Sequence, residues 1–549
     1  MAENDAYPQL SDAEISALER AGVRRSIAVG EYLYREGDAG YDFFTVVSGA
    51  VDIVINAGGK EKLVARQEAG RFLGELNLLT GQRVFVSARV AEPGEVIAVS
   101  RDAMKRLIAT DPSLGDKILA AFIARRAMLM SGASSAIRVI GSRFSPDSGH
   151  VREFLIRSGI PHEWVDPDTD VEVEHSLREL DIAPRDLPVV IASGTVLRHA
   201  TPGLLADYLG LTLEHLPDRS FDLIVVGAGP AGLSAAMYGA SEGLRTLVIE
   251  MVVVGGQAGA SSRIENYLGF PTGISGGELT QRAMVQAQKF GAALTSPCAA
   301  ESLREEAGLF MVRLSDGTDI SGMAIIAATG ARYRKLDAAR LEEFESRGVY
   351  YAATDMEARM CGGSPVVVAG GGNSAGQAAL FLAERGSAVT IVIRGPDLAA
   401  TMSRYLVDRI EADGRIAVRR NTTIVSLEGD RSLAGVRVKG PDGEETIAAS
   451  ALFSFIGAEP ASGWLSGFAA LDNDGFVLTD RSLGREQLTG RWETLGRGPL
   501  PLETSHPGLF AAGDVRCGST KRVATAVGEG SAAVRSVHVY LASDRHRPG

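Results

Sequence analysis

The clearest hydrophobic pattern along the chain is a run of four apolar residues, Leu223–Val226, that opens directly into a glycine-rich turn. Four consecutive apolar residues predict a strand that is buried on both faces of a parallel sheet. A helix rich in small residues is expected from Ala231 to about Glu242, and a second apolar run, Thr246–Ile249, predicts the next strand. The order of strand, glycine turn, helix and strand predicts a βαβ unit.

The three glycines of this turn have the spacing of a dinucleotide-binding site. Gly227 permits the tight turn, Gly229 lets the backbone approach a pyrophosphate, and Gly232 lets the helix pack closely on the strand, while the helix N-terminus faces the phosphates. Glu250, roughly 20 residues further on, is placed to accept hydrogen bonds from ribose hydroxyls. Together with Pro230, this terminal acid favours FAD over NADP as the dinucleotide.

A second unit of the same pattern begins with the apolar run Pro365–Ala369. A glycine turn and a helix start follow, and Ala388–Arg394 is expected to be the next strand. Arg394 ends this strand where the first unit has an acid, and a cation there suits the 2′-phosphate of NADP. NADPH is therefore favoured, with NADH and a merely solvated charge at Arg394 as the alternatives. The expected contacts to NAD(P)H are Gly370, Gly372, Asn373, Ser374, Ala375 and Arg394.

Composition narrows the classes of partner. The chain has 549 residues and a formal net charge of −12 without a basic block, which argues against nucleic acid or an anionic membrane as a partner. No apolar run reaches the ~20 residues of a membrane-spanning helix, and the N-terminus lacks a signal core. A cytoplasmic protein is expected. The three cysteines, Cys298, Cys361 and Cys517, are far apart, so no metal site and no disulfide scaffold is expected.

Residues 1–133 have a different pattern. A capping box from Ser11 to Glu14 starts a short helix, short β-rich segments ended by glycines indicate a jelly roll, and a long helix is expected at 113–129. The segments Glu36–Asp38, Ser48–Gly49 and Phe72–Leu76 resemble those of the cyclic nucleotide-binding domain of the catabolite activator protein.

That resemblance implies that Gly74 and Glu75 hold the cyclic phosphate and the ribose of a cyclic nucleotide. The family also places an arginine on the phosphate, but Val84 stands at that position here and Arg83 comes one residue early. Losing this charge-assisted hydrogen bond costs roughly 1.5–3 kcal/mol. Binding of a cyclic nucleotide and a docking or dimerisation role without a ligand both stay open.

Residues 134–215 predict a small α/β unit with strands at 137–141, 162–166 and 187–191 and helices at 149–158 and 202–209. The order resembles a thioredoxin or glutaredoxin fold, in which Pro188 would match the family's cis-proline. The loop that holds the dithiol in that family contains no cysteine here, and thiol exchange needs a thiolate. A spacer or docking role is expected.

From Phe221 onward the chain resembles the bacterial-type thioredoxin reductases over about 60% of its length. The resemblance rests on Gly255–Gly259, Ile264–Tyr267, Gly269–Pro271, Gly273–Gly276, Ala328–Gly330 and Gly508–Asp514. It implies FAD and NAD(P)H as cofactors and a homodimer, and it places the start of a last helix, at 521–524, near the flavin. The expected FAD contacts are Gly227, Gly229, Pro230, Ala231, Gly232, Glu250, Gly256, Gln257, Asn266, Thr329, Gly330, Gly513, Asp514, Arg522, Val523 and Ala524.

One departure from that family changes the expected chemistry. Ala352 and Asp355 replace the two cysteines of its redox motif, so no catalytic dithiol is present. Three hypotheses stay open. The first is an NAD(P)H-dependent FAD oxidoreductase with a non-thiol acceptor: a ferredoxin, a flavodoxin, a quinone or dioxygen. The second is reduction of a thiol protein through Cys361 or Cys517, and the third is a redox or ligand sensor.

The predicted fold is a multidomain α/β protein with two Rossmann-type units behind a jelly roll and a thioredoxin-like domain. We expect a cyclic nucleotide-binding-like domain at 1–133, a thioredoxin-like domain at 134–215, an FAD-binding domain at 216–337 and 451–549, and an NAD(P)H-binding domain at 338–450.

Overall fold

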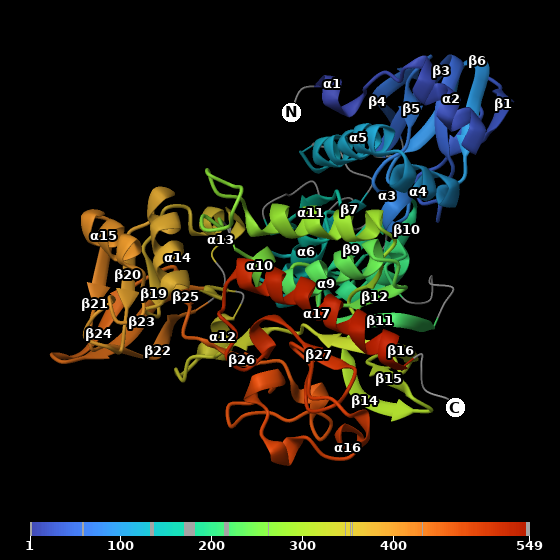
Figure 1. Cartoon of the computed structure of the whole chain (residues 1–549). Coiled ribbons are helices and arrows are strands. Elements are labelled where there is room, and N and C mark those ends of the chain that lie inside the picture. Colours follow the sequence, from blue (N-terminus) through green and yellow to red (C-terminus); the bar gives the residue numbers. More distant parts are fainter. Residues whose placement is uncertain are drawn as a thin grey trace.

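The computed structural model describes residues 3–57, 60–131, 137–168, 182–212, 219–261, 263–345, 347–351, 353, 355–430 and 432–544. The elements form four groups, and the fourth is inserted between two parts of the third (Figure 1). The predicted fold class, two dinucleotide-binding α/β units behind an N-terminal antiparallel sheet and a small α/β unit, is confirmed.

An antiparallel sheet of order β1-β6-β3-β4 forms the N-terminal group, with β2 on β6 and β5 on β3. Its strands are β1 Val23–Ile27, β2 Tyr32–Tyr34, β3 Phe43–Ala57, β4 Lys60–Glu68, β5 Phe72–Leu73 and β6 Ser87–Val99. The helices are α1 Glu3–Ala6, α2 Asp12–Ala21, α3 Asn77–Thr80, α4 Arg101–Thr110 and α5 Pro112–Ser131. The capping box of Ser11 and Glu14 starts α2 as predicted.

The second group is a sheet of order β10-β9-β7-β8. It consists of β7 Ile137–Ile140, α6 Pro146–Arg157, β8 Glu163–Val165, η1 Pro184–Asp186, β9 Val189–Ala192, β10 Thr195–Leu197 and α8 Pro202–Leu209. Strands β7 and β8 are parallel, and β9 is antiparallel to β7. The Leu187–Pro188 bond is cis, as the thioredoxin-like resemblance implied.

The third group is a seven-stranded sheet in which β11, β12, β13, β16 and β27 are parallel and β14 and β15 form an antiparallel extension. The strands are β11 Ser220–Val226, β12 Thr246–Ile249, β13 Ala293–Thr295, β14 Ala300–Glu306, β15 Leu309–Leu314, β16 Asp319–Ala327 and β27 Leu509–Ala511. The helices are α9 Pro230–Ser241, α10 Gly256–Gly259, α11 Gly276–Lys289 and α17 Val523–Asp544. Helix α17 begins two residues later than the sequence predicted.

The fourth group is a parallel sheet of order β18-β25-β19-β20-β21 with a three-stranded antiparallel sheet, β22-β23-β24. The strands are β18 Val349–Tyr350, β19 Val366–Ala369, β20 Val389–Val392, β21 Ile416–Arg419, β22 Thr423–Gly429, β23 Leu433–Gly440, β24 Gly443–Ala448 and β25 Ala451–Ser454. The helices are α12 Leu341–Phe344, α13 Asp355–Cys361, α14 Asn373–Glu384 and α15 Arg404–Ala412. Strands β17 Ala331–Tyr333 and β26 Ala458–Pro460 join this group to the third.

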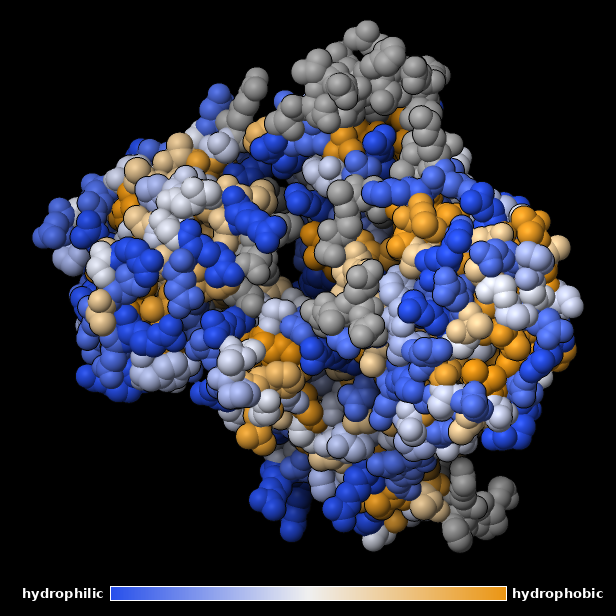
Figure 2. All heavy atoms as spheres, turned by 90° about the horizontal axis from the view of Figure 1, so that it is seen from above, coloured by the Kyte–Doolittle hydropathy of each residue, from blue (hydrophilic) through white to orange (hydrophobic). Residues whose placement is uncertain are grey.

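One predicted strand end in the fourth group is wrong. Strand β20 stops at Val392, so Arg394 lies two residues beyond it. The strand ends there because it pairs with β19 over only four residues. In Figure 2 a hollow separates this lobe, at the left, from the rest of the molecule, and polar side chains cover much of the face shown.

The first three groups share packed cores. Val285 of α11 lies in the core of the N-terminal group, and Phe85 and Val253 lie in the core of the second group. Burial of apolar side chains across these boundaries holds the groups in fixed contact. No helix in the described ranges is long and apolar enough to cross a membrane.

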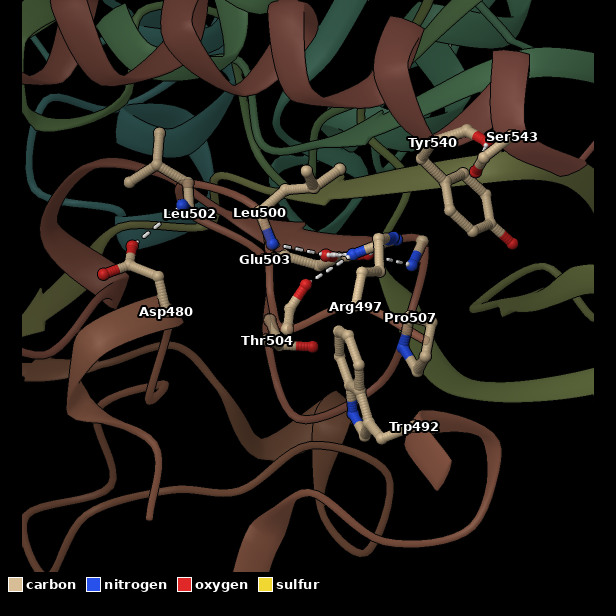
Figure 3. Close-up of polar contacts among 12 residues, drawn as sticks. Asp480, Trp492, Arg497, Leu500, Leu502, Glu503, Thr504, Pro507, Tyr540 and Ser543 are labelled. Carbon is tan, nitrogen blue, oxygen red and sulfur yellow. Dashed lines mark hydrogen bonds and ion pairs between the residues drawn. The ribbon is translucent and has the colours of Figure 1, made fainter. Parts of the chain in front are cut away.

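A segment before β27 contains the short helices η3 Gly463–Leu465, η4 Asp480–Ser482, η5 Arg485–Gln487 and α16 Arg491–Leu495, and η6 Gly513–Val515 follows β27. The buried carboxylate of Glu503 anchors this segment (Figure 3). It accepts hydrogen bonds from both terminal nitrogens of Arg497 and from the backbone amides of Leu500 and Gly508, at 2.7–3.0 Å. This network fixes the chain just before β27 and the turn that carries Asp514.

Candidate functional site

The turn between β11 and α9 has the geometry that its glycines predict. Gly227 has a φ of 107°, and a Cβ there would lie 2.3 Å from the carbonyl oxygen of Ala328. A Cβ at Gly232 would lie 1.8 Å from the carbonyl oxygen of Gly227. These two glycines are required by close backbone contacts.

Gly229 differs from its neighbours because the space in front of it is open. A Cβ there would meet nothing closer than the Cα of Gly256, 4.0 Å away. Gly229 caps the N-terminus of α9, where Pro230 and Ala231 begin the helix. Unpaired amides at a helix N-terminus and open space in front of them fit a dinucleotide pyrophosphate.

Glu250 lies directly after β12 and is held by the turn itself. Its carboxylate accepts hydrogen bonds from the amides of Ala228, at 2.7 Å, and Val252, at 3.0 Å. Burial raises the pKa of this carboxyl, and the amide hydrogen bonds oppose the rise. The acid is thereby oriented at the end of β12, beside the glycine turn, where a ribose is expected.

The second and third expected contact segments lie against the same turn. Helix α10 begins at Gly256, opposite Gly229, and the Gln257 side chain donates a hydrogen bond to the carbonyl oxygen of Ala331. Thr329 Oγ1 donates to the carbonyl oxygen of Ala461 at 2.7 Å, and the Ala461 amide donates to Gly330 at 3.0 Å. These hydrogen bonds join the two parts of the third group around the glycine turn Gly227–Gly232, and together they form one cradle.

The C-terminal contact segment is fixed on α9. A Cβ at Gly513 would lie 2.9 Å from the Cβ of Ala231, and one at Gly530 would lie 2.1 Å from the Ala231 carbonyl oxygen. The amide of Gly513 donates to Glu529 at 2.7 Å. Burial raises the pKa of the neighbouring Asp514 carboxyl. The sequence reasoning missed Glu529 and Gly530, although a glycine inside a helical pattern is a signal of close packing.

Some of the expected FAD residues are exposed and are not fixed by close contacts of this kind. Asn266 lies exposed on the loop between the bridged residues Ile264 and Ile274. Arg522 is exposed just before α17, and Val523 and Ala524 form its first turn. The structure therefore brings together the glycine turn, Glu250, Gly256, Thr329 and Gly513, whereas Asn266 and Arg522 are exposed residues for which no contact with this arrangement is seen among the described residues.

The second glycine turn repeats this geometry in the fourth group. Gly370 has a φ of 126°, and a Cβ there would lie 2.2 Å from the carbonyl oxygen of Phe455. Gly372 caps α14 and has no atom within 4 Å of a Cβ position, so the helix N-terminus that carries Asn373, Ser374 and Ala375 is open in front. Asn373 Oδ1 accepts a hydrogen bond from the amide of Ser403, at 2.7 Å.

Arg394 is exposed beyond β20, and among the described residues no hydrogen bond or ion pair involves its side chain. Arg404, the next cation along the chain, pairs with Asp408 at 2.9 Å on the surface of α15. Arg394 is thus exposed and unpaired among the described residues, whereas Arg404 is engaged.

Of the two positions expected to hold redox cysteines, the structure describes one. Ala352 is outside the described residues, and Asp355 is the first residue of α13. Cys361 ends this helix in a buried position, and burial raises the pKa of its thiol to about 11. Burial and a hydrogen bond to Asp472 also raise the pKa of the Cys517 thiol. Both effects disfavour the thiolate that thiol–disulfide exchange needs.

In the N-terminal group, Glu75 forms a buried ion pair with Arg126, with an Oε2–Nη2 distance of 2.7 Å. Val84 is buried, and Arg83 donates instead to the carbonyl oxygens of Tyr208 and Gly37. Arg126 also donates to the Gly159 carbonyl oxygen at 2.9 Å, which ties this group to the second one.

These features match known proteins. A family model described as pyridine nucleotide-disulphide oxidoreductase matches residues 221–530, and one described as cyclic nucleotide-binding domain matches residues 24–111. A thioredoxin reductase from Treponema pallidum is 35% identical over 326 residues, which are 59% of this chain and 98% of that protein. One from Listeria monocytogenes is 32% identical over 332 residues, covering 59% and 95%.

Among solved structures, thioredoxin reductase from T. acidophilum is similar with a TM-score of 0.52 and 28% identity, over 60% of this chain and all of that one. The matched stretch carries both glycine turns and all the expected FAD and NAD(P)H contacts. The chain therefore belongs to the pyridine nucleotide-disulphide oxidoreductase family, among the thioredoxin reductase-like members, and carries a cyclic nucleotide-binding-type domain in front of the oxidoreductase part.

Proposed function

We propose that the protein binds FAD and NADPH and passes electrons from NADPH, through the flavin, to an acceptor outside the chain. The observation that carries the proposal is the pair of open helix N-termini, at Gly229 and Gly372, each beside glycines that close backbone contacts require. Bound FAD supplies the hydride-accepting ring, and the protein supplies alignment and electrostatics. Glu250 would orient the ribose of FAD, and Arg394 would select NADPH over NADH.

The acceptor in this proposal is not a thiol. Ala352 and Asp355 leave the chain without the dithiol of its relatives, and the buried Cys361 thiol has a pKa of about 11. A ferredoxin, a flavodoxin, a quinone or dioxygen accepts electrons without a thiolate on the enzyme. The three cysteines then serve as packing or surface residues.

Anaerobic mixing of the FAD-loaded protein with NADPH, and in parallel with NADH, tests the first half of the reaction. Rapid loss of the visible flavin absorption with NADPH is expected, because the helix N-termini at Gly229 and Gly372 are both open. Turnover with added ferredoxin, flavodoxin or quinone then identifies the acceptor. Absence of bleaching with either nucleotide would contradict the proposal.

Disulfide reduction through Cys517 is the competing chemistry, since Cys517 follows Asp514 by three residues. Its raised thiol pKa argues against it. If Cys517→Ser abolished reduction of a protein disulfide while flavin bleaching by NADPH was unchanged, the thiol route would replace the non-thiol acceptor. Turnover of Cys517→Ser equal to that of the wild type supports our proposal.

Regulation by the N-terminal domain is a second candidate function, and a continuous set of contacts favours it. Arg126 of α5 donates to the Gly159 carbonyl oxygen, and Arg157, two residues earlier, donates to the Gly256 carbonyl oxygen in the expected FAD cradle. A ligand of the N-terminal domain that displaces α5 would alter this cradle. The test is the rate of flavin reduction with and without such a ligand. A homodimer stays a prediction from the family resemblance, and a cytoplasmic location stays a prediction from the sequence.

A further inference from the structure

The N-terminal domain encloses a cavity of about 270 Å³ between its sheet and α5. At roughly 30 Å³ per water molecule in the liquid, this equals about nine waters, enough for a small organic ligand. The wall is mostly apolar. It is formed by Tyr7, Tyr34, Ile53, Ile55, Leu63, Val64, Phe72, Leu73, Gly74, Val86, Met128 and Leu129, with Lys62, Gln67, Glu75 and Arg125 as the polar members.

The groups that would hold a cyclic nucleotide here are already engaged. Glu75 is paired with Arg126 and also accepts a hydrogen bond from the Asn77 amide, at 3.2 Å. Val84 brings no charge to a phosphate, and Arg83 points to carbonyl oxygens of Gly37 and Tyr208. A cyclic phosphate and a ribose hydroxyl would therefore be buried without charged partners, which is unfavourable.

Gln67 on β4 is the unsatisfied polar group of the cavity. Its side chain is 1% exposed, and among the described residues neither Oε1 nor Nε2 has a hydrogen-bond partner. A buried amide without partners costs roughly 1–3 kcal/mol. Native proteins seldom leave such a group unpaired, so a polar atom of a ligand is expected beside it.

Arg125 on α5 is the second polar group beside which a ligand is expected. It donates to the carbonyl oxygens of Ala6, Gly74 and Phe72 at 2.6–3.0 Å, and among the described residues it forms no ion pair with a carboxylate. The neighbouring Glu75–Arg126 pair is neutral, so one positive charge remains in the buried cluster. Buried charges are normally paired with a charge of opposite sign.

From these observations we propose that the cavity binds a monocarboxylic acid with a hydrophobic body, and not a cyclic nucleotide. The carboxylate neutralises Arg125 and accepts a hydrogen bond from Nε2 of Gln67. The body lies against the aliphatic and aromatic wall. A fatty acid of medium length and an aryl-alkyl carboxylate share this chemistry.

Calorimetric titration of the FAD-loaded full-length protein tests the proposal, with decanoate and 4-phenylbutanoate as the two carboxylate probes. Decan-1-ol and cyclic AMP serve as the uncharged and the nucleotide probes. At least one carboxylate is expected to bind at least tenfold more tightly than both of these, and the better one distinguishes an alkyl from an aryl ligand. Tighter binding of cyclic AMP, equal binding of decan-1-ol, or no binding of either carboxylate would overturn the proposal.

Variants place the ligand in the cavity. Gln67→Leu is expected to weaken carboxylate binding at least tenfold, and Leu73→Trp, which fills the cavity, to abolish it. Val64→Trp replaces Leu73→Trp if that variant does not fold. Glu68→Gln, an exposed residue of β4 that does not line the cavity, should change affinity less than threefold. Full binding in Gln67→Leu, or an equal loss in Glu68→Gln, would contradict the proposed site. Because the readout is binding, it is independent of electron transfer.

Discussion

Arg157 donates a hydrogen bond from Nη2 to the backbone carbonyl oxygen of Gly256, at 2.5 Å. Arg157 is the last residue of α6, in the second group, and Gly256 lies opposite Gly229 in the cradle expected to hold FAD. A unit that has no dithiol thus makes a direct contact with the oxidoreductase part. The hydrogen bond joins the Gly256 loop to the end of α6.

Arg157→Ala is therefore expected to weaken FAD binding by about tenfold, because a hydrogen bond from a charged donor contributes about 1.5–3 kcal/mol. Titration of the apoprotein with FAD, followed by quenching of flavin fluorescence, measures the effect. Arg152→Ala on the same helix is the control, since Arg152 stacks on Trp164 and not on the loop. Equal losses in both variants would assign the effect to α6 stability instead.

The first glycine turn offers a matched pair of substitutions. Gly229→Ala adds a methyl group where only open space lies within 4 Å, so the apoprotein should keep its melting temperature while FAD binding falls at least tenfold. Gly232→Ala places the methyl group 1.8 Å from the Gly227 carbonyl oxygen, so the fold itself should be destabilised. Thermal unfolding of both apoproteins and their FAD content after reconstitution measure the difference. Unchanged FAD binding in Gly229→Ala would show that the pyrophosphate lies elsewhere.

The sequence was sufficient for the parts of the site that local spacing determines. Gly227, Gly229 and Gly232 lie within six residues, and their roles depend on a turn that the same residues form. The contacts of Arg157 with Gly256 and of Arg126 with Glu75 join residues 99 and 51 positions apart, and no local pattern encodes them.

Other differences between the predicted and the observed structure also have local physical causes. The strand before Arg394 ends early because its neighbour β19 offers only four residues for pairing. Gln67 is a polar residue at an inward position of β4, and this position could have indicated a polar site. The residues that lie opposite its amide cannot be predicted from the sequence of β4 alone. The cavity beside Gln67 depends on α5, which lies about 50 residues further along the chain.

Arg394 should determine the choice of nicotinamide nucleotide. Arg394→Gln removes a cation that makes no other contact among the described residues, so KM for NADPH is expected to rise about tenfold or more with little change for NADH. Steady-state rates with both nucleotides measure these changes in KM. Arg404→Gln is the matched control, because Arg404 is engaged by Asp408. A larger effect of Arg404→Gln would move the 2′-phosphate site to α15.

The thiol of Cys361 should react slowly with iodoacetamide and only at high pH. Its pKa of about 11 lies above the ordinary value of 9, so the thiolate fraction at pH 8 is about a hundredfold lower than that of an ordinary cysteine. The rate should keep rising up to about pH 11. Mass spectrometry of alkylated peptides measures this, with Cys517 as the internal reference, because Cys517 is less buried. Fast alkylation of Cys361 at pH 7 would reopen the thiol route.

Removal of one partner of the buried Glu503–Arg497 pair should destabilise the segment before β27 (Figure 3). Glu503→Gln removes the charge and replaces one acceptor oxygen by a donor, facing four N–H groups that need acceptors. Breaking a buried pair typically costs about 3–5 kcal/mol. Glu493→Gln, on the exposed surface of α16, should change the free energy of unfolding by less than about 0.5 kcal/mol. Denaturant unfolding compares the two variants.

Since β27 leads directly to Gly513 and Asp514, Glu503→Gln should also release FAD at a lower denaturant concentration than the wild type does. Equal stability of the two variants would mean that packing, and not the ion pair, fixes this turn.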